Sequence, residues 1–219
     1  MKRRDFWMAG PGAASLLGLG GNLGLSPQAQ AQGGPVEGTH YVKLAQPVPV
    51  AASGKVEVVE FFWYGCPHCH ALEPALEGWL KRLPPDVSFR RAPVAFSPQH
   101  EFHQRLYFAL EASGLVESMH RKVFNAIHVE RKSLTREADV AAWFTSQGQD
   151  GAKMVETMKS FGVQTKARQA RQLAEAYRID GVPAIGVQGR YYTSSAMAGG
   201  HERTFAVADA LINLARRAA

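Results

Sequence analysis

The chain has 219 residues, of which 46% are hydrophobic and 20% are charged. This composition is typical of a globular protein with one substantial core, and it excludes a largely disordered chain and a membrane-embedded one. The net charge of +6 is mild and the basic residues are scattered, so we expect no nucleic-acid partner.

The first 31 residues have the pattern of a cleavable export signal. Three basic residues at 2–4 precede an uncharged stretch at 7–25, and Ala29-Gln30-Ala31 offers the small residues that signal peptidases accept. Pro11 and several glycines make this stretch a poor membrane helix, although an uncleaved anchor is an alternative. We therefore expect a signal peptide at 1–31 and a mature chain that works outside the cytoplasm.

The sequence leaves the export route open. Arg3-Arg4-Asp5-Phe6 resembles the twin-arginine signal, and the low hydrophobicity of the following stretch suits that route. Adjacent arginines also occur in ordinary signal peptides, so both routes stay possible.

The hydrophobic pattern predicts an α/β protein. Runs rich in β-branched and aromatic residues predict strands at 41–44, 55–64, 87–94, 184–187 and 190–193, the last two as a hairpin. Apolar residues at spacings of three and four predict a helix from Cys69 onward, a mostly helical segment over 97–162, and helices over 165–177 and 203–217. Pro74 should kink the first helix, and Gly114, Gly148 and Gly162 should end helices.

The long helical block interrupts the sheet-forming segments. We expect a sheet domain whose first part is 32–96 and whose second part is 165–219. The intervening 97–164 is long enough to form a small helical insertion domain.

The two cysteines, Cys66 and Cys69, are the most informative feature of the sequence. No further cysteine is present for a structural disulfide, so the pair itself is the candidate site. Cys66 lies where a predicted strand ends and a helix begins, and the free N–H groups of a first helical turn favour a thiolate. Pro67 fits such a turn, and His68 can add charge or a hydrogen bond. Cys69, one turn deeper, can act as the resolving thiol.

Other interpretations of the pair are open from the residues alone. Cys66-Pro67-His68-Cys69-His70 also matches the attachment pattern of c-type haem, although here it follows a buried aromatic strand. A zinc site is less well supported, because no second cysteine pair is present. We expect no metal and no cofactor besides the Cys66–Cys69 disulfide.

Four segments together resemble the DsbA family of periplasmic disulfide-forming proteins, which have a thioredoxin-like fold with an inserted helical domain. The segment 60–69, ending in Cys66-Pro67-His68-Cys69, is similar to the start of that family's active site. Gly181-Val182-Pro183-Ala184 resembles its cis-proline loop, and Val187-Gln188-Gly189-Arg190-Tyr191 resembles the hairpin that follows. The order of helices between Ser97 and Gly162 suits the family's inserted domain. Pro74 matches the kink proline of thioredoxin's active-site helix.

The resemblance implies a role for each residue of the site. Cys66 would be the exposed attacking sulfur, Cys69 its buried partner, and His68 a group that stabilises the Cys66 thiolate. Glu60 matches a buried acid that relays protons, and its neighbours Val59 and Phe61 favour burial. Val182 and Pro183 would present backbone groups to an extended substrate peptide.

The resemblance also implies partners. The substrates would be unfolded or reduced exported proteins in the periplasm, and a quinone-linked membrane protein of DsbB type would reoxidise the pair. We expect a monomer. A disulfide reductase or isomerase is the alternative, although Pro67-His68 differs from the Gly-Pro of thioredoxin and the Gly-His of eukaryotic isomerases. A non-catalytic peptide-binding module is a further alternative, and His70 departs from the aromatic residue that relatives often carry.

Overall fold

The computed structural model describes residues 33–51 and 54–218, so the expected signal peptide at 1–31 lies outside the described residues. From Gly34 onward the chain forms one compact unit. Its strands are β1 (Val42–Lys43), β2 (Val56–Phe62), β3 (Val87–Pro93), β4 (Ala184–Val187) and β5 (Tyr191–Ser194). Its helices are α1 (Pro67–Leu80), α2 (Pro98–Ala112), α3 (Val116–His128), α4 (Glu137–Ser146), α5 (Gly151–Lys159), α6 (Phe161–Ala176), α7 (Ser195–Ala198) and α8 (His201–Arg217).

The strands form one mixed sheet in the order β1-β5-β4-β2-β3. β2 lies between β3, to which it is parallel, and β4, to which it is antiparallel. All seven residues of β2 are buried, as expected for a central strand covered on both faces. Helix α1 makes the crossover from β2 to β3, so residues at the end of β2 lie next to the start of α1.

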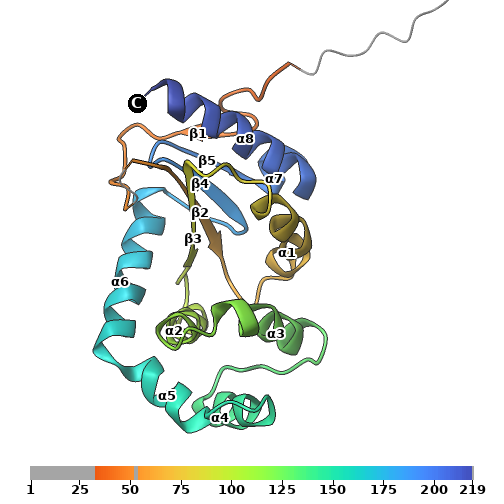
Figure 1. Ribbon diagram of the computed structural model, residues 1–219, viewed down its shortest axis with the longest axis vertical. Helices are drawn as coiled ribbons and strands as arrows, with labels where there is room; N and C mark the ends of the chain where they lie inside the picture. Colours follow the sequence, from red (N-terminus) through yellow and green to blue (C-terminus); the bar gives the residue numbers. More distant parts are fainter. Residues whose placement is uncertain (1–32, 52–53, 219) are drawn as a thin grey trace, which may run out of the picture. The chain divides into compact units, whose positions relative to one another are not determined.

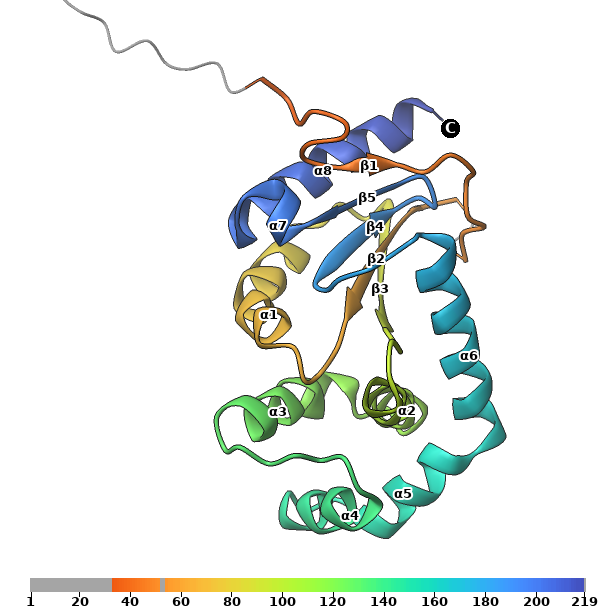
Figure 2. The ribbon, with the colours of Figure 1, turned by 180° about the vertical axis from the view of Figure 1, so that it is seen from behind.

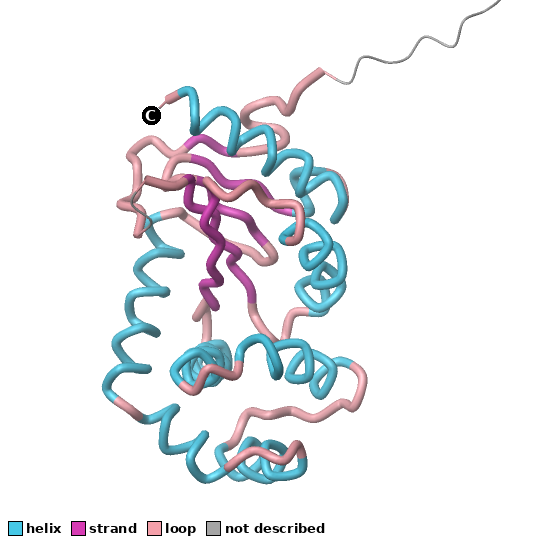
Figure 3. Tube along the Cα trace, viewed as in Figure 1, coloured by secondary structure: helices cyan, strands magenta, loops and turns pink. Residues whose placement is uncertain are grey.

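Helices cover both faces of the sheet (Figures 1 and 2). Leu72, Leu76 and Trp79 of α1 and Leu211 of α8 pack in one apolar cluster with β2 and β4. The opposite cluster contains Phe61 of β2 together with residues of α2–α6. Figure 3 shows α2–α5 gathered beyond the end of the sheet, where β2 and β3 finish.

The predicted strands and most helices are confirmed, with one correction. Gly162, predicted to end a helix, lies inside α6, which begins at Phe161 rather than Thr165. The hydroxyl of Ser160 accepts a hydrogen bond from the backbone N–H of Val163 and caps α6, so the break between α5 and α6 falls at the serine. The short helix α7 was not predicted, and α1 continues through Pro74.

Within the residues that the structure describes, no helix combines the length and hydropathy needed to cross a membrane.

Gly186 is needed where α6 and β4 meet. A Cβ at this position would lie 2.6 Å from a ring carbon of Tyr177 and 3.1 Å from one of Phe61. The Tyr177 ring cannot retreat freely, because its hydroxyl accepts a hydrogen bond from the Gly189 N–H at 2.8 Å. We expect Gly186→Ala to lower the free energy of unfolding of the reduced protein by about 1–3 kcal/mol, measured by chemical denaturation.

Gly78→Ala is the matched control. Gly78 is exposed within α1 and a Cβ there would meet nothing within 4 Å. Its replacement should raise the free energy of unfolding by about 0.5–1 kcal/mol, because alanine favours a helix interior. Equal stability of Gly186→Ala and the unaltered protein would contradict the packing argument.

Candidate active site

A tight turn places Cys66 between β2 and α1. β2 ends at Phe62, and the Cys66 N–H donates to the Trp63 carbonyl oxygen at 3.0 Å. Gly65 makes this turn possible, because a Cβ at that position would lie 2.3 Å from the Trp63 ring. The predicted position of the motif, at the exit from the central strand, is therefore confirmed.

Cys66 is the N-cap residue of α1. Its backbone is extended (φ −85°, ψ 116°), and its sulfur accepts a hydrogen bond from the Cys69 N–H at 3.4 Å. Pro67 occupies the first turn, where a missing N–H costs no helical hydrogen bond. The positive end of the helix dipole thus points at the Cys66 sulfur, which favours its thiolate.

Both cysteines are free thiols and both are buried, although not equally. Cys66 has 7% of its surface exposed and Cys69 has none. The expectation that Cys66 would be exposed is therefore too strong: it is the accessible one of the two, but its surroundings cover most of it. One neighbour is the Val182 carbonyl oxygen, which lies 3.5 Å from the Cys66 sulfur and accepts a hydrogen bond from it when Cys66 is in its thiol form.

The two thiols differ sharply in acidity. A hydrogen bond from the Cys69 thiol is the largest influence on Cys66, and with backbone N–H groups and the charge of His68 it outweighs burial, so that the pKa of Cys66 falls to about 6. Burial, followed by the interaction with Cys66, raises the pKa of Cys69 well above its ordinary value. At neutral pH the pair therefore holds a thiolate at Cys66 and a protonated thiol at Cys69. The charge of His68 contributes to this difference, but less than Cys69 does.

The loop before β4 contributes the second backbone element of the site. The Val182–Pro183 peptide bond is cis, as the resemblance implied. Pro183 is buried while Val182 is half-buried, and the Val182 carbonyl faces the Cys66 sulfur. This loop therefore lies against the redox pair although 116 residues separate Val182 from Cys66 in the chain.

Glu60 is fully buried beneath the pair. It lies directly opposite Arg91 across β2 and β3, and the Arg91 Nε donates to a Glu60 carboxylate oxygen at 2.9 Å. Burial is the largest influence on the pKa of Glu60 and raises it, and the charge of Glu73 raises it further. The charge and hydrogen bond of Arg91 act in the opposite direction but are outweighed. A charge on Glu60 would in turn raise the pKa of Cys69, so the two groups interact electrostatically.

Arg91 also serves a second buried carboxylate, that of Glu73. Its other guanidinium nitrogen donates to Glu73 at 3.4 Å, and the Nε2 of His120 lies 3.2 Å from the remaining Glu73 oxygen. The Tyr64 hydroxyl lies 2.8 Å from Nδ1 of the same imidazole. Burial opposes ionisation of Glu73, but His120, Arg91 and Arg121 overcome it and lower the pKa of its carboxyl. Burial also lowers the pKa of His120, so we assign a neutral ring that accepts from Tyr64 and donates to Glu73.

Sequence reasoning missed Glu73, Arg91, His120 and Tyr64. The sequence did contain a signal for Glu73, which is an acidic residue within the apolar stripe of a predicted helix. It lies beside Leu72 and one turn before Leu76. A charged residue on an apolar face is buried only when paired, and pairing between α1, β3 and α3 cannot be read from local spacing.

His70 joins α1 to α3. Its ring stacks on that of His128, with 4.9 Å between centroids and 8° between planes, and its Nε2 lies 3.1 Å from the Asn125 side-chain oxygen. The Nε2 of His128 donates to the Tyr64 carbonyl oxygen at 2.8 Å. The His70 imidazole thus takes part in a contact between the redox helix and the inserted helices.

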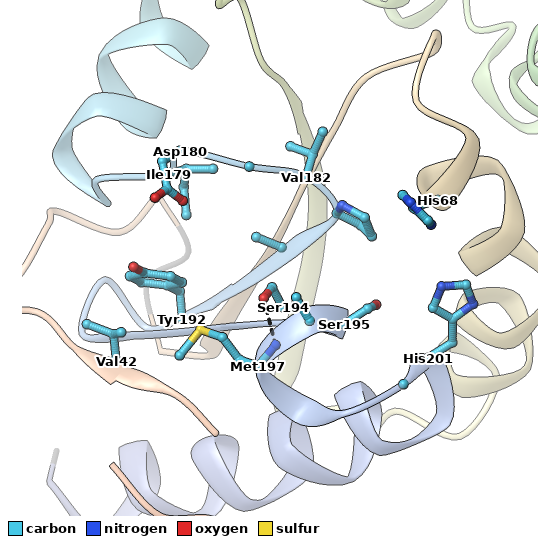
Figure 4. A pocket seen from close by; sticks show the side chains of 15 residues that line it. Val42, His68, Ile179, Asp180, Val182, Tyr192, Ser194, Ser195, Met197 and His201 are labelled. Carbon is cyan, nitrogen blue, oxygen red and sulfur yellow. Dashed lines mark hydrogen bonds between the residues drawn. The ribbon is translucent and has the colours of Figure 1, made fainter. Parts of the chain in front are cut away.

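An apolar groove of about 690 Å³ begins beside His68. Figure 4 shows it bounded by the cis-proline loop, β5 and the segment from α7 to α8. Its apolar lining includes Ile179, Val182, Pro183, Tyr192, Ala196 and Met197. An extended peptide could place side chains here while its backbone lies along the cis-proline loop.

Among the described residues, no cluster of three or more histidine, cysteine or acidic side chains is arranged to hold a metal ion.

Comparisons with known proteins agree with this geometry. Residues 97–212 match the family described as DSBA-like thioredoxin domain. The thiol:disulfide interchange protein DsbA of Pseudomonas aeruginosa is 40% identical over 205 residues, which cover 94% of this chain and 96% of that protein. The protein of the same name from Bordetella pertussis is 44% identical over 200 residues, covering 91% of this chain and 93% of that one.

Solved structures give the same result. The crystal structure of Pseudomonas aeruginosa DsbA is 42% identical and matches with a TM-score of 0.79, covering 83% of this chain and 94% of that chain. The thioredoxin-like fold with inserted helices is therefore confirmed. The chain belongs to the DsbA family of thiol:disulfide oxidoreductases.

Proposed function

We propose that this protein is the oxidant in periplasmic thiol–disulfide exchange and that it donates the Cys66–Cys69 disulfide to reduced exported proteins. The observation that carries the proposal is the unequal acidity of the two thiols. A thiolate that is stable at neutral pH favours the reduced pair, and this makes the disulfide a strong oxidant.

The exchange proceeds in two steps. A substrate thiolate attacks the Cys66 sulfur, the bond between the two cysteines breaks, and Cys69 leaves as a thiolate that takes up a proton. A second substrate thiolate then attacks the mixed disulfide, and Cys66 leaves. Two electrons pass from the substrate to the pair. The low pKa of Cys66 makes it a good leaving group in the second step.

The other site residues have supporting roles in this proposal. Glu60, with its raised pKa, holds a proton next to buried Cys69 and can supply or remove it. Val182 and Pro183 offer backbone to the substrate peptide, and His68 adds charge near Cys66. No further cofactor is needed, and the protein acts as a monomer.

A membrane protein of DsbB type that passes electrons to quinone would restore the disulfide. The family resemblance supports such a partner, because a donor that is consumed in each cycle needs an oxidant of its own. The signal-like residues at 1–31 support export to the periplasm by either route.

The reduction potential of the pair tests the direction of the reaction. We expect roughly −120 mV, as for strong oxidants, rather than the roughly −270 mV of thioredoxin. Because the pKa of Cys66 is about 6, one proton should accompany two electrons above that pH and two protons below it. The potential should then fall by about 30 mV per pH unit above pH 6 and by about 60 mV below it.

Equilibration with glutathione buffers, followed by tryptophan fluorescence of Trp63 and Trp79, measures these values. His68→Ala should move the change of slope to a slightly higher pH, because the charge of His68 is one of the smaller causes of the lowered pKa. A potential near roughly −270 mV would support a reductase instead.

Cysteine variants test the assigned roles. Cys69→Ser is first treated with oxidised glutathione, so that Cys66 carries glutathione in a mixed disulfide. A thiolate of a reduced substrate protein then attacks the Cys66 sulfur and glutathione leaves as a thiol, so mixed disulfides with the substrate should accumulate because Cys69 is absent and cannot attack them. Cys66→Ser should form none and should not turn over. Non-reducing gels and mass spectrometry detect the adducts. If Cys66→Ser kept full activity, the chain would act as a peptide-binding module and the exchange mechanism would fail.

Glu60→Gln tests the proton transfer. Glutamine can still accept the hydrogen bond from Arg91 but carries no transferable proton, so we expect substrate oxidation to slow by about tenfold or more. The loss should grow with pH, as protons from the solvent become scarce.

Glu57→Gln is the matched control, because Glu57 is also buried on β2 and paired with an arginine, Arg90. Its replacement should lower stability and leave the rate and its pH profile unchanged. Equal rate losses in both variants would assign Glu60 a structural role only.

A further inference from the structure

The groove beside the redox pair has an uneven distribution of charge. Figure 4 shows His68 and His201 together at one end, and Asp180 lies toward the other end beyond the apolar middle. His68 comes from the first turn of α1 and His201 is the first residue of α8. The starts of two long helices therefore meet at the same end of the groove, and both favour negative charge.

The two imidazoles are available for a ligand. Within the described part of the chain, neither His68 nor His201 forms a side-chain hydrogen bond. Five other histidines do: His40, His70, His100, His120 and His128. His68 is exposed and His201 is half-buried in the wall of the groove. A histidine with free ring nitrogens can donate to a carboxylate, and it does so more strongly when protonated.

Geometry limits which substrate residue can reach them. A substrate cysteine must contact the Cys66 sulfur, which lies 3.5 Å from the Val182 carbonyl oxygen. His68 follows Cys66 by two residues in the first turn of α1, and an extended peptide advances about 3.3 Å per residue, so substrate residues close to the reacting cysteine are the ones that can reach this end of the groove. Apolar substrate side chains farther along fit the middle of the groove.

We propose that His68 and His201 select substrates with an acidic residue next to the reacting cysteine. This inference rests on the proposed function and adds a substrate class to it. Asp180 at the far end strengthens the selection, because it disfavours the reverse placement of an acidic side chain there.

Three reduced peptides that differ at one position test the proposal. Each carries a cysteine followed by apolar residues, with aspartate, asparagine or lysine directly beside the cysteine. Their oxidation by the oxidised full-length mature protein is measured as kcat/KM at low ionic strength, where interactions between charged groups are least screened. Because the substituent also changes the reactivity of the peptide thiol, each rate is divided by the rate of the same peptide with oxidised glutathione.

We expect the corrected kcat/KM to be about two- to fivefold higher for the aspartate peptide than for the asparagine peptide, and lowest for the lysine peptide. Added salt should reduce the difference. His201→Gln, which keeps a polar side chain of similar size, should lower the ratio between aspartate and asparagine peptides. Glu202→Gln, which changes a charge on the same turn of α8 but outside the groove, should not lower it.

The outcomes distinguish the charge selection by His68 and His201 from the proposed function on which it rests. Equal corrected rates for the three peptides, with all of them oxidised, would overturn the charge selection and leave the proposed function intact. A preference for aspartate that survived His201→Gln unchanged would overturn the assignment to this pair of histidines. If the unaltered protein oxidised none of the peptides or reduced model proteins, the proposed function would fail and the inference with it.

Discussion

The chemistry of the site depends on the burial of the Cys69 sulfur, a single helical turn from the sulfur of Cys66. Cys66 is the N-cap of α1, where a hydrogen bond from the Cys69 thiol and the backbone N–H groups of the first turn stabilise its thiolate. Cys69 lies in the core with no exposed surface, and burial keeps it protonated. The same short segment thus holds two groups of the same chemical type in opposite protonation states. This difference in acidity favours the reduced pair, so the disulfide acts as an oxidant.

The buried ionisable groups below the pair also differ in protonation state, so their charges nearly cancel. One guanidinium, that of Arg91, faces two buried carboxylates. His120 adds a second donor to Glu73, so Glu73 is the better stabilised anion, and Glu60 is left with the raised pKa. A neutral Glu60 beside a single ion pair keeps the net charge of the interior near zero, which avoids the large cost of an unpaired buried charge. Glu60, the acid whose charge acts on the pKa of Cys69, is therefore the one able to exchange a proton.

Local patterns predicted the parts of this protein that local forces determine. The run of β-branched and aromatic residues fixes β2, and the spacing of Cys66 and Cys69 places both on one turn of α1. Gly162 misled the prediction because Ser160 supplies a better helix cap two residues earlier. The partners of Glu60 could not be predicted, since Arg91, Glu73 and His120 come from β3, α1 and α3 and meet only in the folded chain. The groove was missed for the same reason, because its walls come from five separate segments.

The arrangement separates the path of the substrate from the path of the proton. The groove reaches α1 at His68, whereas Glu73 and His120 line a different cavity, of about 380 Å³, together with Glu77 and Arg121. His68 and Glu73 lie about 140° apart around the helix, because each residue advances about 100°. On the proposed mechanism, a peptide in the groove leaves the second cavity uncovered, because the two lie on different sides of α1. A proton can then reach the buried charges of Glu73, Arg91 and His120 from the side away from the substrate.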